Sequence, residues 1–407
     1  MANKPKIRFK GFDDAWEQRK LGELGSLKNG MNFSKKAMGI GFPFVNLQNI
    51  FGNNVIDVSN LGKAMASDSQ LKDYNLLNGD VLFVRSSVKL EGVGEAALVP
   101  QTLDNTTYSG FIIRFRDEYG LDNNFKRFVF GIESVRNQIM SQATNSANKN
   151  ISQSVLENLE LAIPSKSEQQ KIGAYFSNLD HLITLHQRKC DQMNELKKYM
   201  LTKMFPQNGS KVPEIRFDGY TDDWEQRKLG ELGTITTGNT PSTSIPDYYS
   251  DDGIVWVTPT DICENITFES ARKLSDLGQQ VGRVVPKNTI LVTCIASIGK
   301  NTMLGNTGSF NQQINGLTPN ENKYDPYFLL TESALWSAKM KGSAAAGTMQ
   351  IVNRTEFSEL KTWLPSLIEQ QAIGAFFKQL DHLITLHQSK CENLKNLKKY
   401  MLRNMFV

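Results

Sequence analysis

The sequence predicts an α+β protein made of two tandem copies of one unit, and three observations support this prediction. Residues Pro5–Gly25 and Pro213–Gly233 are identical at 16 of 21 positions. Residues Glu168–Phe205 and Glu369–Phe406 are identical at 26 of 38 positions. The segments between these pairs differ, and a constant frame around two different middles indicates two reading heads held in one geometry.

Each variable middle contains short apolar runs that follow turn residues, which is typical of β-strands. These runs lie at Phe42–Ile50, Asn78–Ser87, Ile254–Ile262 and Lys287–Ser297. Amphipathic helices are expected before each middle closes, near Asn124–Gln142 and Pro326–Met340. The middles are therefore expected to fold as α+β domains.

A long helix is expected at the end of each copy, after Pro164 and Pro365. Apolar residues recur there at i, i+3, i+4 and i+7, which makes a broad stripe that must be buried. A second series, which includes Leu182 and Leu196, widens this stripe. About 40 helical residues span roughly 60 Å, and so long a helix usually packs against an equivalent one. We expect the two helices to form an antiparallel coiled coil with a seam of Ile172, Leu179, His186, Met193, Ile373, Leu380, His387 and Leu394.

The repeat offsets divide the chain into four segments. The expected recognition domains are residues 1–160 and 206–362, and the expected spacer helices are residues 161–205 and 363–407. Splicing Val407 to Met1 would simply continue the repeat. This pseudo-cyclic order predicts two half-molecules related by a pseudo-twofold axis.

The composition excludes several classes of protein. No apolar run approaches the ~20 residues of a membrane span, and the N-terminal ten residues lack the apolar core of a signal peptide. The four cysteines form no CxxC pair, so a reducing cytoplasm is the expected location. A net charge of +4 permits nucleic-acid binding without arguing for it.

The sequence contains no recognisable catalytic machinery. The sequence lacks a phosphate-binding P-loop, a nuclease signature and the Asp-Pro-Pro-Tyr type of motif that amino-methyltransferases use. These absences predict a non-catalytic protein. His186, Cys190, His387 and Cys391 would converge as a zinc site if the helices crossed near their centres. Packing of these side chains in the helix seam explains them equally simply, and we predict no metal.

Polar and basic residues gather in the expected loops of both middles. Their side chains are of the types that read base edges and grip phosphates, although polar loops are also common without any such role. The candidate DNA-binding residues are Lys35, Lys36, Arg85, Ser86, Lys89, Asn148, Lys149, Asn239, Thr240, Thr258, Thr260, Ser297, Lys300, Gln312, Gln313, Thr348 and Gln350.

The repeated frame offers candidates for binding a protein partner. Trp16 and Trp224 each precede the run Glu-Gln-Arg-Lys, which contains Arg19 and Arg227. We expect these four residues to contact partners, while burial of the tryptophans in the core and a merely solvated charged run remain the alternatives.

The arrangement resembles the specificity subunits of type I restriction-modification systems. The resemblance covers essentially the whole chain and rests on Trp-x₄-Leu-Gly-Glu-Leu (Trp16–Leu24, Trp224–Leu232) and on Pro-x₃-Glu-Gln-Gln-x-Ile opening each long helix (Pro164–Ile172, Pro365–Ile373). The second middle also matches family-like segments such as Ile290–Ile314. The first middle departs from them, because FVRSSVKLEG stands where the second has Ala-Ser-Ile-Gly-Lys.

The resemblance implies a non-catalytic subunit in which each variable domain reads one half of a bipartite, asymmetric DNA target. It also implies that the helices and repeats dock two methyltransferase subunits, and that motor–nuclease subunits complete the restriction complex. S-adenosylmethionine, ATP and magnesium would then be bound by the partners and not by this chain. A stand-alone, repressor-like protein with two DNA-binding heads remains the alternative.

Overall fold

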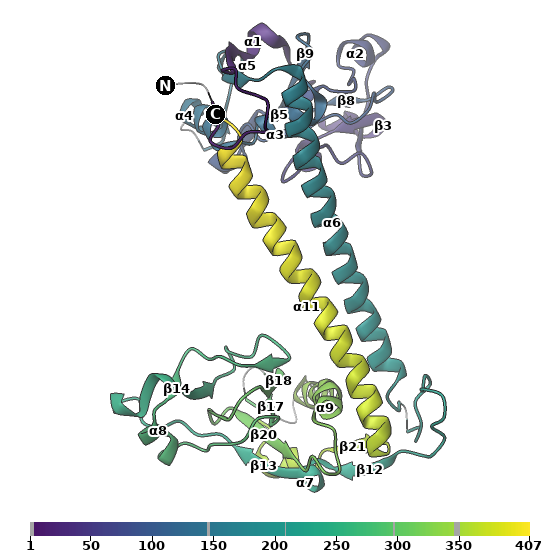
Figure 1. Ribbon diagram of the computed structural model, residues 1–407. Helices are drawn as coiled ribbons and strands as arrows, with labels where there is room; N and C mark the ends of the chain where they lie inside the picture. Colours follow the sequence, from purple (N-terminus) through teal and green to yellow (C-terminus); the bar gives the residue numbers. More distant parts are fainter. Residues whose placement is uncertain (1–3, 145–146, 208, 296–297, 346–350) are drawn as a thin grey trace. The chain divides into compact units, whose positions relative to one another are not determined.

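The computed structural model describes residues 4–144, 147–207, 209–295, 298–345 and 351–407, and the chain divides into two compact units (Figure 1). Unit 1 comprises Met1–Gln187 with Ser389–Val407, and unit 2 comprises Arg188–Gln388. Each unit therefore combines one variable middle with parts of both long helices, α6 (Lys166–Lys203) and α11 (Leu367–Asn404).

Unit 1 is built from short strands and helices around the first part of α6. Its strands are β1 (Glu17–Lys20), β2 (Gly25–Asn29), β3 (Met38–Val45), β4 (Gly62–Ala64), β5 (Val81–Val84), β6 (Ser86–Ser87), β7 (Ala96–Leu98), β8 (Thr107–Tyr108), β9 (Ile112–Asp117), β10 (Lys149–Asn150) and β11 (Glu160–Ile163). Its shorter helices are α1 (Leu21–Leu24), α2 (Asp68–Asp73), α3 (Asn123–Val129), α4 (Glu133–Gln142), α5 (Gln153–Glu157) and the 3₁₀ turns η1 (Lys35–Ala37), η2 (Leu47–Asn49) and η3 (Leu90–Gly92).

Unit 2 repeats most of this order. Its strands are β12 (Glu225–Lys228), β13 (Gly233–Thr237), β14 (Tyr249–Val257), β15 (Ile266–Thr267), β16 (Lys273–Leu274), β17 (Ile290–Thr293), β18 (Asn301–Leu304), β19 (Gly308–Phe310), β20 (Ile314–Pro319) and β21 (Lys361–Leu364). Its shorter helices are α7 (Leu229–Leu232), α8 (Asp276–Val281), α9 (Pro326–Ala345), α10 (Arg354–Glu359) and the 3₁₀ turn η4 (Pro246–Tyr248).

The sheets of the two units correspond. Unit 1 has a four-stranded sheet in the order β2-β9-β5-β7 and a three-stranded sheet in the order β4-β3-β8. Unit 2 has a five-stranded sheet, β13-β20-β17-β18-β15, and a three-stranded sheet, β16-β14-β19. In both three-stranded sheets one pair is parallel, β3 with β8 and β14 with β19. The predicted α+β class and the four predicted strand segments are thus confirmed.

The central strands β5 and β17 are buried on both faces, because each lies between two hydrophobic cores. Val81 and Phe83 enter the core shared with the helices, while Leu82 and Val84 enter the core beneath the three-stranded sheet. Strand β17 divides its side chains in the same way between two cores. The expected helix at Asn124–Gln142 is interrupted between α3 and α4 around Gly131, whereas α9 is continuous.

The long helices bury a narrower stripe than the sequence suggests. The seam residues Ile172, Leu179, Ile373 and Leu380 are buried, and His186, Met193, His387 and Leu394 are half-buried. In the second series, Leu182 and Leu196 are 40% and 45% exposed, so the prediction that they widen the buried stripe is wrong. The buried positions follow a 4-3 spacing through Phe176 and Cys190, because contact with one antiparallel helix covers only one stripe.

Matched ion pairs fix the helix register inside each unit. In unit 1, Lys398 Nζ lies 2.5 Å from Asp180 Oδ1, and in unit 2, Lys197 Nζ lies 2.6 Å from Asp381 Oδ1. The Cys391 thiol contacts the Ile183 carbonyl in unit 1, so residue numbers rise along one helix as they fall along the other. The helical segments of each unit are therefore antiparallel, as predicted.

Each long helix begins at a buried polar anchor. The Glu168 carboxylate is 1% exposed and accepts two hydrogen bonds from the Arg8 guanidinium, at 2.7 and 2.8 Å. Glu369 and Arg216 repeat this pair with the same two distances. The repeated Ile-Arg-Phe and Glu-Gln-Gln motifs are thus kept together because they bind one another.

The end of each long helix completes a core. In unit 1, the Phe406 ring lies 6.2 Å from Trp16 and 5.7 Å from Phe125. In unit 2, Phe205 lies 5.9 Å from Trp224. After the helix ends, the Ile215 N–H bonds the Lys203 carbonyl, and the Ile7 N–H makes the matched bond to the Asn404 carbonyl. The pseudo-cyclic order of the sequence is thus seen in these contacts.

Within the described part of the chain, none of the helices combines the length and the apolar character needed to cross a membrane.

Candidate nucleic-acid interface

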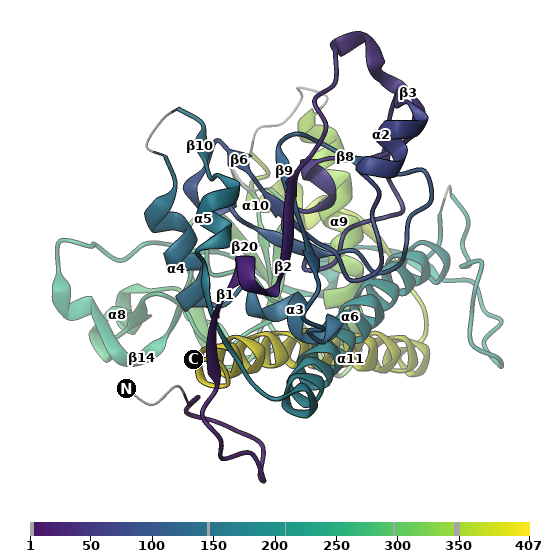
Figure 2. The same ribbon diagram turned by 90° about the horizontal axis from the view of Figure 1, so that it is seen from above.

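Two loops of unit 1 meet beside a tight turn at residues Ser109–Ile112. The Ile112 N–H closes this turn on the Ser109 carbonyl at 2.9 Å. The Arg85 N–H bonds the Phe111 carbonyl at 2.8 Å, and its guanidinium donates to the Gly110 carbonyl at 3.3 Å. Strand β6 pairs with β10 next to Arg85, as Figure 2 shows from above. This edge is therefore a rigid, hydrogen-bonded platform.

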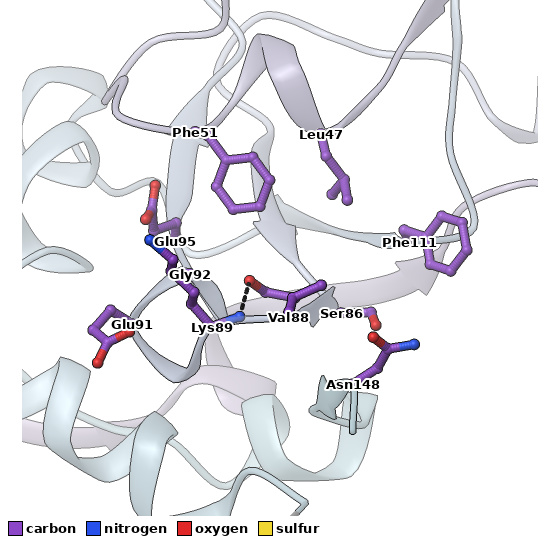
Figure 3. Close-up of a pocket in the computed structure, with 11 residues that line it drawn as sticks. Leu47, Phe51, Ser86, Val88, Lys89, Glu91, Gly92, Glu95, Phe111 and Asn148 are labelled. Atoms are coloured by element: carbon purple, nitrogen blue, oxygen red, sulfur yellow. Dashed lines mark hydrogen bonds between the residues drawn. The ribbon is translucent and has the colours of Figure 1, made fainter. Parts of the chain in front are cut away.

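A pocket of about 540 Å³ opens on this platform (Figure 3). Phe111, Ser86 and Asn148 lie at one end, and Glu91, Glu95 and Lys89 lie at the other end. Val88 is 77% exposed and Phe111 is 60% exposed, so the rim presents large apolar side chains to solvent. A pocket of this size lined by apolar and polar side chains is a candidate binding site.

Unit 2 presents a corresponding edge. Its turn runs from Asn311 to Ile314, closed by a 3.2 Å bond from the Ile314 N–H to the Asn311 carbonyl. The Thr240 hydroxyl bonds the Gln312 amide oxygen, and Lys300 Nζ donates to the Pro259 carbonyl at 3.0 Å. These contacts join four loop segments of the second middle in two pairs.

The backbone bonds of the two edges match one for one. The Arg85–Phe111 bond of unit 1 corresponds to a 2.8 Å bond from the Cys294 N–H to the Gln313 carbonyl in unit 2. Ile151 and Val352 likewise donate to the carbonyls of Arg85 and Cys294. The backbone platform is therefore shared, while the side chains on it differ.

Burial raises the pKa of the Cys294 thiol to about 11, although a hydrogen bond from Asn315 opposes that shift. The side chain therefore stays a neutral thiol near neutral pH and is a poor nucleophile or metal ligand. This position of the shared platform carries no reactive group in unit 2.

The unit 1 candidates fall mostly on the platform. Lys89 is exposed, Asn148 lines the pocket and Lys149 pairs with Ser87 in the β10–β6 ladder. Ser86 is 9% exposed but borders the same pocket. Lys35 and the exposed Lys36 lie in η1, away from the other candidates in sequence, and the Lys35 side chain lies outside the described residues.

The unit 2 candidates divide into three groups. Thr240, Thr260, Lys300 and Gln312 are exposed, and Gln313 is half-buried. Asn239 and Thr258 have structural roles instead: the Asn239 amide bonds Val281 and Arg283, and the Thr258 hydroxyl bonds Asp261, so their polar groups are already used. Ser297, Thr348 and Gln350 lie outside the described residues.

The tryptophans of the frame are buried inside their units, which corresponds to the core alternative. Trp16 and Trp224 are 3% and 2% exposed, because they pack in the cores against Phe406 and Phe205. Arg19 and Arg227 stay accessible and are paired with nearby glutamates on β1 and β12. Of the four frame candidates, only the arginines can meet another protein.

The two cysteines considered for zinc pack in the helix seam. Cys190 lies in an apolar cluster with Leu380 and Ile384 in unit 2, and Cys391 contacts Ile183 in unit 1. Across the described ranges, no group of three or more His, Cys, Asp or Glu side chains is arranged to hold a metal ion.

Two features escaped the sequence analysis. Phe111 and Val88 are apolar residues inside a variable middle, and no periodicity separates an exposed residue there from a buried one. Arg8 and Arg216 could have been identified, because each recurs in a repeated Pro-x-Ile-Arg-Phe motif whose apolar neighbours suggest a buried partner for the charge.

Comparison with known families gives a match over most of the chain. The model of the "Type I restriction modification DNA specificity domain" matches residues 13–195 and again residues 221–396. The two matches correspond to the two copies of the repeat.

Individual relatives agree with this match. A Methanocaldococcus jannaschii protein assigned to the MjaX type I restriction system as its specificity subunit is 22% identical, covering 98% of this chain and 95% of that protein. The crystal structure of a type I restriction-modification S subunit from M. genitalium has a TM-score of 0.64 at 15% identity, with 99% of both chains covered. A structure describing complex assembly and conformational transition of a type I system has a TM-score of 0.56 at 18% identity, covering 97% of this chain and 98% of that one.

Proposed function

The chain belongs to the family of type I restriction-modification DNA specificity proteins, and from this premise we propose how it recognises DNA. Each unit reads one half of a bipartite, asymmetric target through the platform of its variable middle. The observation that carries this proposal is the matched backbone of the two platforms, which hold Phe111 in unit 1 and Gln313 in unit 2 at one position. One backbone with two sets of side chains is suited to reading two different half-sites.

The constant parts of the chain have a different role in this proposal. Arg19 and Arg227 occupy matching positions of the repeated frame, so two copies of a methyltransferase subunit can dock in the same way. Leu397 and Tyr400 in unit 1 are 42% and 57% exposed on the outer side of α11, which adds apolar surface for such a partner. Motor–nuclease subunits would then join the assembled complex.

The chemistry of modification belongs to the partners. The chain supplies sequence recognition, whereas S-adenosylmethionine, ATP and magnesium are expected on the methyltransferase and motor subunits. Support for this division comes from the residues of the platforms, which are amides, hydroxyls, cations and apolar side chains suited to contacting DNA.

A block swap tests the assignment of half-sites. Residues 26–160 are replaced by the equivalent block of a family member with a different target, and the methylated sites of the host genome are mapped. One half-site should change while the other half-site and partner binding stay the same. The reciprocal swap of residues 234–362 is the matched control and should change the other half-site.

Two results would contradict the proposal. A swap that alters both half-sites would show that the units do not read independently. Specific DNA binding by the purified chain without any co-purifying methyltransferase, and with no methylation in the host, would favour the stand-alone, repressor-like alternative.

A further inference from the structure

The turn at Ser109–Ile112 and its counterpart at Asn311–Ile314 expose opposite chemistry from one backbone. The first turn carries Gly110 and Phe111, and the second carries Gln312 and Gln313. Phe111 is 60% exposed, so most of its apolar surface stays in water in the isolated protein and is available for burial against a ligand. Its exposure therefore points to a ligand.

The apolar surface around Phe111 is shared by two loops. Val88 lies on the loop after β6 and is 77% exposed, and Phe51 on the opposite side of the pocket is 38% exposed. Figure 3 shows Phe111 at the end of the pocket near Ser86 and Asn148, away from the carboxylates of Glu91 and Glu95. An anionic ligand would thus approach from the Phe111 end, next to Arg85.

The position of this surface identifies the occupant as DNA and not a protein. A methyltransferase must meet both units on their constant frame, but this turn lies in the variable middles and differs between them. The side chains at this shared backbone position suit different base features, because an aromatic ring contacts a methyl group and an amide makes hydrogen bonds. In the major groove, thymine presents a C5-methyl group, and adenine presents N6 and N7 to glutamine.

We propose that Phe111, supported by Val88, reads the C5-methyl group of a thymine in the half-site of unit 1. In unit 2, Thr240 and Asn311 bond the amide oxygens of Gln312 and Gln313, so we assign their amide nitrogens as donors to base edges of the other half-site. This inference rests on the proposed function and names the specificity-determining contact of the first unit. The Arg85 guanidinium fixes the turn through the Gly110 carbonyl, so the ring is presented on a rigid support.

Replacement of thymine by deoxyuridine removes only the methyl group and tests this contact directly. The target is first mapped from genomic methylation, and the block swap identifies the half-site of unit 1. The specificity subunit with its methyltransferase is then titrated with duplexes that carry deoxyuridine at single thymines. One position in the unit 1 half-site should bind about fourfold more weakly, as expected for one buried methyl group. Thymines in the other half-site should tolerate the change.

Variants separate this contact from a general loss of affinity. Phe111→Ala should bind thymine and deoxyuridine duplexes equally, while Phe111→Leu should keep part of the discrimination. Gln313→Ala is the matched control, and it should leave the deoxyuridine effect in the first half-site unchanged. Because Phe111 is exposed, its replacement is not expected to impair folding.

The outcomes distinguish this inference from the proposed function. Three results would overturn the inference alone while the complex still binds a specific sequence. Deoxyuridine has no effect in the unit 1 half-site, the discrimination against deoxyuridine persists in Phe111→Ala, or that half-site contains no thymine. Failure of the complex to bind or methylate any specific sequence would overturn the proposed function.

Discussion

Burial of Glu332 on α9 gives the stability of unit 2 a pH dependence that can be measured. This carboxyl group is 3% exposed, and burial raises its pKa to about 8. The Trp363 N–H, at 3.3 Å, and the Thr362 hydroxyl both favour the charged form of this carboxyl group, but they do not offset the effect of burial on its pKa. Glu332 is therefore protonated in the folded protein near neutral pH.

The sign of the effect follows from this raised pKa. Between pH 4.5 and about 8 the folded state holds a proton that the unfolded state has released, so rising pH favours unfolding. The free energy of unfolding should fall by ~1.4 kcal/mol for each pH unit in this window, or by ~4 kcal/mol between pH 5 and pH 8. Below pH 4.5 the full contribution of Glu332 to the free energy of unfolding is present, and above about pH 8 this contribution is lost.

Glu332→Gln removes the ionisable group with little change of shape, so its unfolding free energy should lack this component. Urea unfolding followed by tryptophan fluorescence from pH 5 to 9 reports mainly on unit 2, which contains Trp224, Trp256, Trp336 and Trp363. The exposed Glu264→Gln is the control and should keep the wild-type slope.

Unit 1 supplies a second comparison. The caps of α3 and α9, Asp122 and Asp325, correspond, and Val129 then occupies the position of Glu332. Glu332→Val should also abolish the pH dependence. If the free energy of unfolding changed with pH in the same way for the wild type and both variants across pH 5 to 9, Glu332 would not be the source of the pH dependence.

Three further predictions concern the anchors, the platform and the long helices. Glu168→Gln should destabilise unit 1 by about 3 kcal/mol, because it leaves the Arg8 guanidinium without its buried partner, and a shift of the urea midpoint measures this loss. Combined replacement of Lys36 and Lys89 by glutamine should weaken binding to all sequences alike and reduce the slope of log affinity against log salt by up to ~2, whereas an unchanged slope would remove them from the interface. Insertion of four residues within Asn194–Lys198 adds ~6 Å and about one helical turn, so the unread spacer between the half-sites should lengthen by one or two base pairs. Insertion of two residues turns the apolar stripe by ~200° and should therefore weaken assembly of the complex. Genomic methylation maps measure both insertions, and an unchanged spacer in an active four-residue variant would show that the helices do not set it.

The repeat made most of the architecture predictable. Identical segments must adopt the same structure in both copies, so the frame, the helix starts and the antiparallel pairing followed from their positions. The width of the helix stripe was overestimated because Leu182 and Leu196 are apolar yet 40% and 45% exposed. Sequence periodicity shows which residues share a face, but it does not show how much of that face a single partner helix covers.

The candidate site was harder to predict, because loop chemistry depends on contacts between distant residues. Asn239 looks like a base-reading amide in sequence, yet its two bonds go to Val281 and Arg283. Trp16 looks like a partner anchor, yet Phe406 from the other end of the chain covers it. Phe111 carries no signal in its local sequence, and only the structure shows that a turn exposes its ring.

The packing of Phe406 against Trp16 also has a consequence for synthesis on the ribosome. Unit 1 begins to form first, but Met405 and Phe406 belong to its core and follow the whole of unit 2, Arg188–Gln388. At ~5–20 residues per second, these roughly 200 intervening residues take about 10–40 s to translate, during which the apolar face around Trp16 stays open. Unit 2 has no such delay, because Phe205 precedes Trp224 in the chain. The half of the protein that is made first is therefore the half that is completed last, and it is the half most in need of a chaperone.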